Sequence, residues 1–237
     1  MAIYMMREYN PSELCFTAEQ TNSTITLNKS WSPALVSLET STDWQTWSDY
    51  TFGTLITLTN IGDKVYWRNK SETVTRFSTS SSAFYRFVIT GLVGASGDVN
   101  YLLCKNSTLS LETPSTRCFY RLFYGNAYLT SSPKLPATTL SVSCYLDMFR
   151  LCTQLSTLPE LPAATLPNSC YQWMFQWCSN IKLSSTQTWD YQTPYRIPTE
   201  WTGTEGTQSV KSMFISTGGT VTWVAINTTY YTSNTVV

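Results

Sequence analysis

The chain has 237 residues, no histidine, and a formal net charge of zero from 15 basic and 15 acidic residues. Proteins that neutralise nucleic-acid phosphates need concentrated basic side chains, and no basic stripe is visible, so we expect no nucleic-acid partner. The lack of histidine excludes Ser-His-Asp and Cys-His catalysis and histidine metal ligands. No apolar run is long enough to span a bilayer, which predicts no membrane insertion.

The first residues, MAIYMMREYNPSEL, lack the basic segment, the apolar stretch and the small-residue cleavage site of a secretory signal. We interpret residues 1–15 as an N-terminal arm. Its aromatic and methionine side chains either pack on a partner or belong to a strand or frayed end of the first domain.

Residues 16–90 are rich in β-branched and aromatic residues that alternate with polar ones. The segments expected to form strands are Ser23–Leu27, Ala34–Leu38, Thr54–Leu58, Lys64–Trp67 and Phe84–Ile89. Short alternating runs separated by polar turns predict an antiparallel, immunoglobulin-like β-sandwich.

Residues 91–117 begin with the glycine-rich sequence GLVGASG. The glycine spacing does not match a phosphate-binding loop, and no Gly-Lys-Ser/Thr follows. We therefore interpret this segment as a linker, with a bridging strand over Val99–Leu103.

A 26-residue repeat occupies residues 118–185, and Cys118, Cys144 and Cys170 each begin one copy. A fixed period in this range is typical of a solenoid, in which each unit buries its apolar face on its neighbour. The residues interpreted as structural anchors of the repeat are Cys118, Phe123, Cys144, Phe149, Cys152, Cys170, Phe175 and Cys178.

Within one repeat, Cys144, Met148, Phe149 and Cys152 have the spacing of one helical face, which predicts a short helix or a helical turn. The prolines that follow exclude a helix there and predict an extended loop or edge strand.

Each cysteine of the repeats is either a free, buried thiol or part of a disulfide. Asn126, Cys152 and Cys178 occupy one fixed place per repeat, where leucine-rich repeats hydrogen-bond the turning backbone. We favour free, buried thiols over a Cys144–Cys152 or inter-repeat disulfide, because a thiol packs as a small apolar group. No Cys-x-x-Cys pair is present, so we expect neither a structural zinc site nor another cofactor.

Residues 186–237 depart from the repeat and are interpreted as a β-rich C-terminal cap. Within it, Val210–Phe214 (VKSMF) echoes the Met-Phe pair of the repeats but lies out of register, as a degenerate capping unit would. Residues 220–226 and 228–237 are expected to form closing strands.

The repeat unit, C-Y-x-x-M-F-x-x-C-x-x-L followed by P-x-L-P-A-x-x-L, resembles the bacterial surface-protein type of leucine-rich repeat. Such repeats occur in surface proteins of gut bacteria and in their phages. The preceding block resembles the β-sandwich module that often precedes them. The resemblance implies a non-enzymatic adhesin or a virion surface protein. Two departures are the small number of repeats and the bulky pairs Arg150-Leu151 and Gln176-Trp177.

Five tryptophans are candidates for a binding surface: Trp44, Trp47, Trp173, Trp177 and Trp201. Trp44 and Trp47 lie in a predicted hairpin tip, where a turn gives them little core to enter. Trp173 and Trp177 are four residues apart, so they either form an aromatic platform or cover the open end of the solenoid. Acidic residues form no recognisable glycosidase pair and are interpreted as solvated surface groups.

We therefore expect no enzyme. The first hypothesis is a structural or attachment protein of a phage virion, a head, tail-fibre or decoration component. Its expected partners are other virion proteins, further copies of itself and host-surface glycan, at the virion surface. The alternative is a leucine-rich-repeat adhesin at a bacterial cell surface.

Overall fold

The computed structural model describes residues 12–31, 36–106, 113, 115–181 and 208–217. In these residues the chain is mainly β, with a six-stranded sheet, a three-stranded sheet and one short helix. The prediction of a mainly β chain is therefore confirmed. The described part of the chain contains no helix with the length and apolar character needed to cross a membrane.

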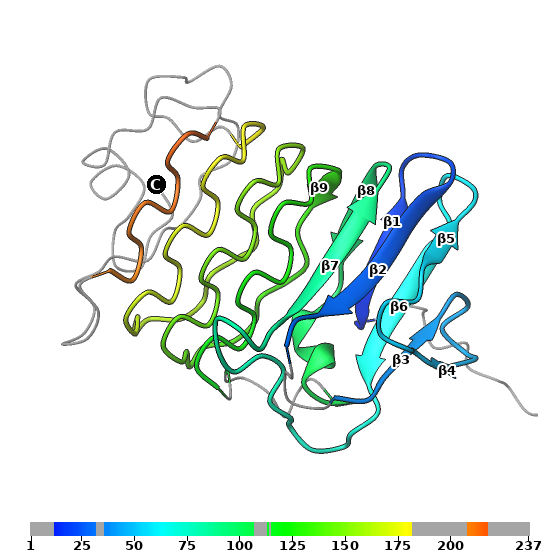
Figure 1. The fold of residues 1–237 in the computed structure, drawn as a ribbon, viewed down its shortest axis with the longest axis horizontal. Coiled ribbons are helices and arrows are strands. Elements are labelled where there is room, and N and C mark those ends of the chain that lie inside the picture. Colours follow the sequence, from blue (N-terminus) through cyan, green and yellow to red (C-terminus); the bar gives the residue numbers. More distant parts are fainter. Residues whose placement is uncertain (1–11, 32–35, 107–112, 114, 182–207, 218–237) are drawn as a thin grey trace, which may run out of the picture.

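The two sheets are on the right of Figure 1. The larger sheet has the order β4-β3-β6-β1-β8-β9, with β4 (Ser48–Asp49), β3 (Leu38–Ser41), β6 (Lys64–Asn69), β1 (Leu14–Ala18), β8 (Val93–Ser96) and β9 (Leu129–Ser131). The smaller sheet has the order β5-β2-β7, with β5 (Ile56–Leu58), β2 (Ser23–Lys29) and β7 (Tyr85–Thr90). All pairs are antiparallel except β8 with β9.

Alternation of buried and exposed residues explains the strand registers. In β2, Ile25 and Leu27 are buried, and they pair with Ile89 and Phe87 of β7. Phe87 also contacts Phe16 of β1, with 4.8 Å between ring centroids. This contact joins the inner faces of the two sheets, so aromatic side chains at period-2 positions form the core between them.

Four of the five predicted strand segments overlap β2, β5, β6 and β7. The fifth, Ala34–Leu38, meets β3 only at Leu38, and part of it lies outside the described residues. The N-terminal arm predicted over residues 1–15 ends earlier in the structure. Its last two residues belong to β1, which begins at Leu14 and pairs with β6 and β8.

The glycine-rich segment is part of the large sheet. β8 pairs with β1 on one side and with β9 on the other. Gly97 follows it with φ +72°, and a Cβ atom there would lie 1.8 Å from the carbonyl oxygen of Glu13. Glycine is needed at this position because the two backbones approach closely.

The bridging strand predicted over Val99–Leu103 is wrong. Val99–Leu102 forms a 3-10 helix, and Asp98 accepts a hydrogen bond from the N–H of Asn100 at 2.7 Å. This side-chain cap supports a helical turn where apolar alternation alone favoured a strand.

Of the two states predicted for this part of the repeat, a short helix or a helical turn, the described residues show no helix and form runs of tight turns. In the described residues the turn runs are 116–125, 142–151, 168–177 and 208–216. Every fourth residue has positive φ, as at Ser143 (56°), Asp147 (58°) and Leu151 (66°), and such residues cannot continue a right-handed helix. Over so short a segment, a four-residue turn period and the 3.6-residue helical period place the same apolar residues on one face. The spacing of the apolar residues therefore could not distinguish turn runs from helices.

Backbone hydrogen bonds in the turn runs alternate between two kinds of acceptor. Every second N–H donates to the residue three positions earlier, as Leu146 does to Ser143 at 3.2 Å. The other N–H groups donate to the next turn run. At one position of the repeat these bonds join Phe119 N to Cys144 O (2.8 Å), Tyr145 N to Cys170 O (2.9 Å) and Tyr171 N to Ser209 O (2.8 Å). The runs therefore lie side by side (Figure 1).

The last described turn run takes the next place in this stack. Phe149 N donates to Met174 O at 2.9 Å, and Phe175 N donates to Met213 O at 3.0 Å. Met213 therefore occupies the position of Met174, although the chain between the two is longer than one period of the repeat. The Val210–Phe214 echo is out of register because additional residues precede this run. The predicted closing strands lie outside the described residues.

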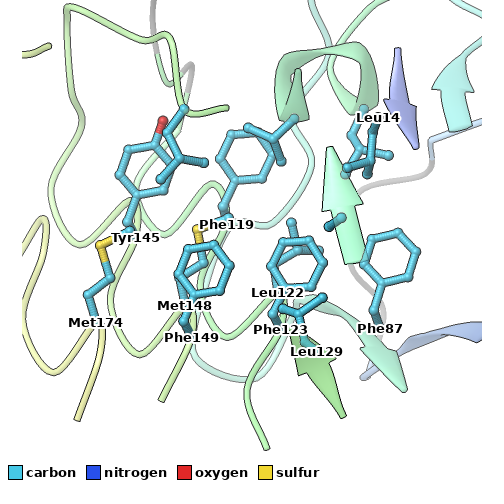
Figure 2. Close-up of a cluster of buried hydrophobic side chains, with 14 of the residues drawn as sticks. Leu14, Phe87, Phe119, Leu122, Phe123, Leu129, Tyr145, Met148, Phe149 and Met174 are labelled. Atoms are coloured by element: carbon cyan, nitrogen blue, oxygen red, sulfur yellow. The ribbon is translucent and has the colours of Figure 1, made fainter. Parts of the chain in front are cut away.

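Two columns of aromatic rings run through the interior of the stack (Figure 2). The first contains Phe87, Phe123, Phe149, Phe175 and Phe214, with successive centroids 5.4, 5.2, 5.5 and 5.4 Å apart. The second contains Phe119, Tyr145 and Tyr171, each pair 5.7 Å apart. Phe87 belongs to β7, so the first column begins between the sheets and continues through the turn runs.

The backbone is continuous at the same boundary. Phe87 N donates to Leu122 O at 2.8 Å, and Val93 N donates to Tyr128 O at 3.1 Å. The small sheet therefore continues into the turn runs, while β8 and β9 extend the large sheet. One cluster of buried apolar residues includes members from the sheets and from all four turn runs.

Candidate functional site

The eight repeat anchors are fully buried, each with 0% exposure: Cys118, Phe123, Cys144, Phe149, Cys152, Cys170, Phe175 and Cys178. Cys152 Sγ donates to Phe123 O at 3.0 Å, and Cys178 Sγ donates to Phe149 O at 2.9 Å. Asn126 uses its amide in the same place, donating to Phe87 O at 2.9 Å and to Phe123 O at 3.0 Å. The column of Asn126, Cys152 and Cys178 therefore makes the side-chain-to-backbone hydrogen bonds that the sequence predicts.

All seven cysteines are free and buried. Burial raises the pKa of Cys144 and that of Cys178 to about 12 each, so both thiols are protonated near neutral pH. A protonated, enclosed thiol is neither a nucleophile nor a metal ligand. Within the described ranges, cysteine and acidic residues form no group of three that could hold a metal ion.

The hairpin tryptophans are less exposed than the sequence predicts. Trp44 Nε1 donates to Glu13 Oε2 at 2.6 Å, and Trp47 Nε1 donates to Trp44 O at 3.1 Å. The Arg68 guanidinium lies 3.7 Å from the centroid of the Trp47 ring. These partners, some from neighbouring strands, hold the two tryptophans, whereas Trp31, before this hairpin, is 89% exposed.

Asp43 orders the loop that carries these tryptophans. Its Oδ1 accepts hydrogen bonds from the backbone N–H groups of Thr46 at 2.7 Å and Gln45 at 2.8 Å. These bonds favour the ionised carboxylate and lower the pKa of Asp43 to about 2.

Trp173 and Trp177 share one surface, as their spacing predicts. Both rings face the guanidinium of Arg150, at 5.5 Å for Trp173 and 4.5 Å for Trp177. Their backbones have positive φ rather than helical geometry. The next turn run, 208–216, stacks on their own run, and both rings contact Arg150 of the preceding run. Trp177 is 39% exposed.

We name this surface the arginine–aromatic face. It is formed by side chains of three neighbouring turn runs: Arg121, Tyr124, Asp147, Arg150, Trp173 and Trp177.

Asp147 holds the two arginines of this face. Arg121 Nε lies 3.0 Å from Asp147 Oδ2, and Arg150 Nη1 lies 3.1 Å from Asp147 Oδ1. The Asp147 side chain is 1% exposed, so its interpretation as a solvated surface group is wrong. A buried carboxylate is stable here because each oxygen has a cationic partner.

Each guanidinium also contacts aromatic rings. Arg121 lies 4.8 Å from the Tyr124 ring, and Arg150 lies 6.0 Å from the same ring in addition to its contacts with the two tryptophans. Cation–π contacts and one shared carboxylate therefore fix both arginines in orientation. Two arginines against one aspartate leave a net positive charge on the face.

Two buried polar atoms at neighbouring positions lack hydrogen-bond partners in the described part of the chain. They are Arg150 Nε, a donor, and Gln176 Oε1, an acceptor. Gln176 follows Arg150 by one period, so it occupies the same place in the next repeat, and it is only 8% exposed.

No protein-family model matches this chain, and searches of curated proteins and of solved structures find no match. Trp201, the last of the candidate tryptophans, lies outside the described residues.

Sequence reasoning missed Arg121, Tyr124 and Asp147. The period contains the signal that could have found them, because Arg121, Asp147 and Trp173 stand at the same place in successive repeats. Stacking at this offset brings an arginine, an aspartate and a tryptophan next to one another. At the Phe123 position, by contrast, every repeat keeps phenylalanine.

A groove of about 480 Å³ lies between the Pro-x-Leu-Pro segments of the first two repeats. Its lining is dominated by proline, leucine and small hydroxyl residues, and its charged residues are Lys134 and Glu160. One base and one acid give this groove no net charge, in contrast to the arginine–aromatic face.

Proposed function

We propose that this protein is a non-enzymatic structural and attachment component of a phage virion surface. In this proposal an immunoglobulin-like β-sandwich is followed by a short leucine-rich-repeat solenoid and a C-terminal cap. The solenoid is a rigid spacer that presents side chains to other virion proteins or to host-surface glycan.

The observation that carries the proposal is the arginine–aromatic face on a continuous stack. The hydrogen bonds and ring contacts between turn runs fix the backbone beneath Arg121, Asp147 and Arg150. Arginine and tryptophan are the residues most enriched where proteins bind partners. The resemblance of the repeat unit to surface-protein repeats points to the same class of function.

The chemistry of the polar residues supports a binding role. The chain has no histidine, and its buried thiols are protonated. Each carboxylate oxygen of Asp147 is bound by an arginine of the same face, so this group has a structural role.

Gold-labelled antibody on purified phage particles, with mass spectrometry of the same particles, tests the proposal. We expect label at a defined place on the particle and peptides in stoichiometric amount. Absence from particles would contradict the proposal, and recovery from a bacterial envelope would instead support a cell-surface adhesin. Sedimentation tests the expected self-association, against which a stable monomer at high concentration would count.

A further inference from the structure

The arginine–aromatic face contains one carboxylate, that of Asp147. Both of its oxygens are already bound by arginines of the same face. Arg121 binds it through Nε and Arg150 through Nη1, so each guanidinium keeps further N–H donors. The side chains of Arg121 and Arg150 are 34% and 19% exposed. The face therefore presents oriented cationic donors to the solvent.

Preorganisation makes these donors suited to ligand binding. Asp147 and the rings of Tyr124, Trp173 and Trp177 hold the guanidiniums before any ligand arrives. A ligand thus loses less free energy in ordering these side chains. A guanidinium presents its donors in a planar fork that matches a carboxylate.

The exposed ring of Trp177 indicates the rest of the ligand. Trp177 is a large aromatic side chain with substantial exposure, against which the apolar face of a sugar ring packs. Sugars supply ring faces, hydroxyl groups and, in their acidic forms, carboxylates.

We propose that the arginine–aromatic face binds carboxylate-bearing glycans. This assignment rests on the attachment role proposed above and names the ligand class for it. Arg121 and Arg150 bind the carboxylate, while Trp177 packs on a sugar ring. An acidic peptide shares the carboxylate but lacks the sugar-ring face that packs on the exposed Trp177, so the glycan is favoured.

Calorimetric titration of the full chain tests this with two acidic probes, polygalacturonate and polysialic acid oligomers. Fully methyl-esterified polygalacturonate is the matched neutral probe, and polyglutamate is the peptide probe. We expect binding to at least one acidic glycan, at least tenfold weaker binding of the methyl ester, and weakening as salt increases. Binding to neither acidic glycan, equal binding of the methyl ester, or tighter binding of polyglutamate would each overturn the proposal.

Variants locate the site. Arg121→Gln and Trp177→Ala are each expected to weaken binding about tenfold or more, as loss of a charged hydrogen bond or a central aromatic does. Lys134→Gln is the matched control, since it removes one positive charge in the proline-lined groove. Near-ultraviolet circular dichroism establishes that each variant is folded, and Arg121→Lys tests the fork while keeping the charge. Unchanged binding in folded Arg121→Gln and Trp177→Ala would overturn the assignment.

The outcome is separable from the test of the proposed function. A protein that is present on particles but binds no acidic glycan retains the virion role and loses this inference. A protein that is absent from particles but binds acidic glycans through Arg121 retains the inference and loses the virion role.

Discussion

The side-chain amide of Asn126 donates a hydrogen bond to the backbone carbonyl of Phe87, in the strand β7, at 2.9 Å. Asn126 Oδ1 also accepts from Ile89 N at 2.9 Å. One buried side chain thus joins the first repeat to the small sheet, where later repeats use cysteine for a single hydrogen bond.

Asn126→Ala should therefore destabilise the protein more than Cys152→Ala. The first change removes three hydrogen bonds to buried backbone groups, and we expect a loss of about 3 kcal/mol in the free energy of unfolding. The second removes one thiol hydrogen bond, with an expected loss of about 1 kcal/mol plus a small packing term. Chemical denaturation measures both. Asn126→Cys should lie between them, and equal losses for the two alanine variants would contradict the assigned role.

Asp147→Asn should destabilise the stack because two arginines lose their shared charged partner. We expect the free energy of unfolding to fall by about 2–3 kcal/mol. This loss is at or below the usual range for breaking a buried ion pair, because Arg121 keeps contact with water. Thermal and urea unfolding measure the change. Glu160→Gln alters an exposed carboxylate of the same repeat and should have little effect. Equal effects of the two changes would show that Asp147 is not the centre of the face.

Positive φ at Leu151 predicts an unusual preference for glycine. Left-handed backbone is costly for residues with a Cβ atom, so Leu151→Gly should be more stable than Leu151→Ala by about 1 kcal/mol. At Leu146, whose φ is not positive, the order should reverse, because glycine there only adds freedom to the unfolded chain. Paired unfolding curves measure both differences. The same order at both positions would contradict the turn-run geometry.

Asp43 predicts a pH dependence for the tryptophan hairpin. Its pKa is lowered from 3.8 to about 2, so its contribution to stability is present above pH 3.8. That contribution is lost as the pH falls from 3.8 towards 2. Asp43→Asn should therefore be less stable than the unmodified protein at about pH 6, and the difference should shrink through this window. A difference that stays constant through the whole window would argue against the loop hydrogen bonds.

The sequence predicts the interior of the repeats better than their surface. The recurrence of phenylalanine at one place per repeat identifies Phe123, Phe149 and Phe175 as one column, because identical apolar residues recur wherever units stack. The same period could not distinguish turn runs from helices, since the two spacings coincide over so short a segment. The Trp44–Glu13 hydrogen bond joins residues 31 positions apart through tertiary packing, which no local pattern reveals.

The two sheets and the repeats share one core through the column of rings from Phe87 to Phe214. Hydrogen exchange of Phe123→Ala, read by mass spectrometry, tests it most directly. Loss of this ring, which contacts Phe87 of β7 on one side and Phe149 on the other, should cost about 3–5 kcal/mol and accelerate exchange both in β7 and in the third turn run. Acceleration in the turn runs alone, with β7 unchanged, would show two separate cores and contradict the account.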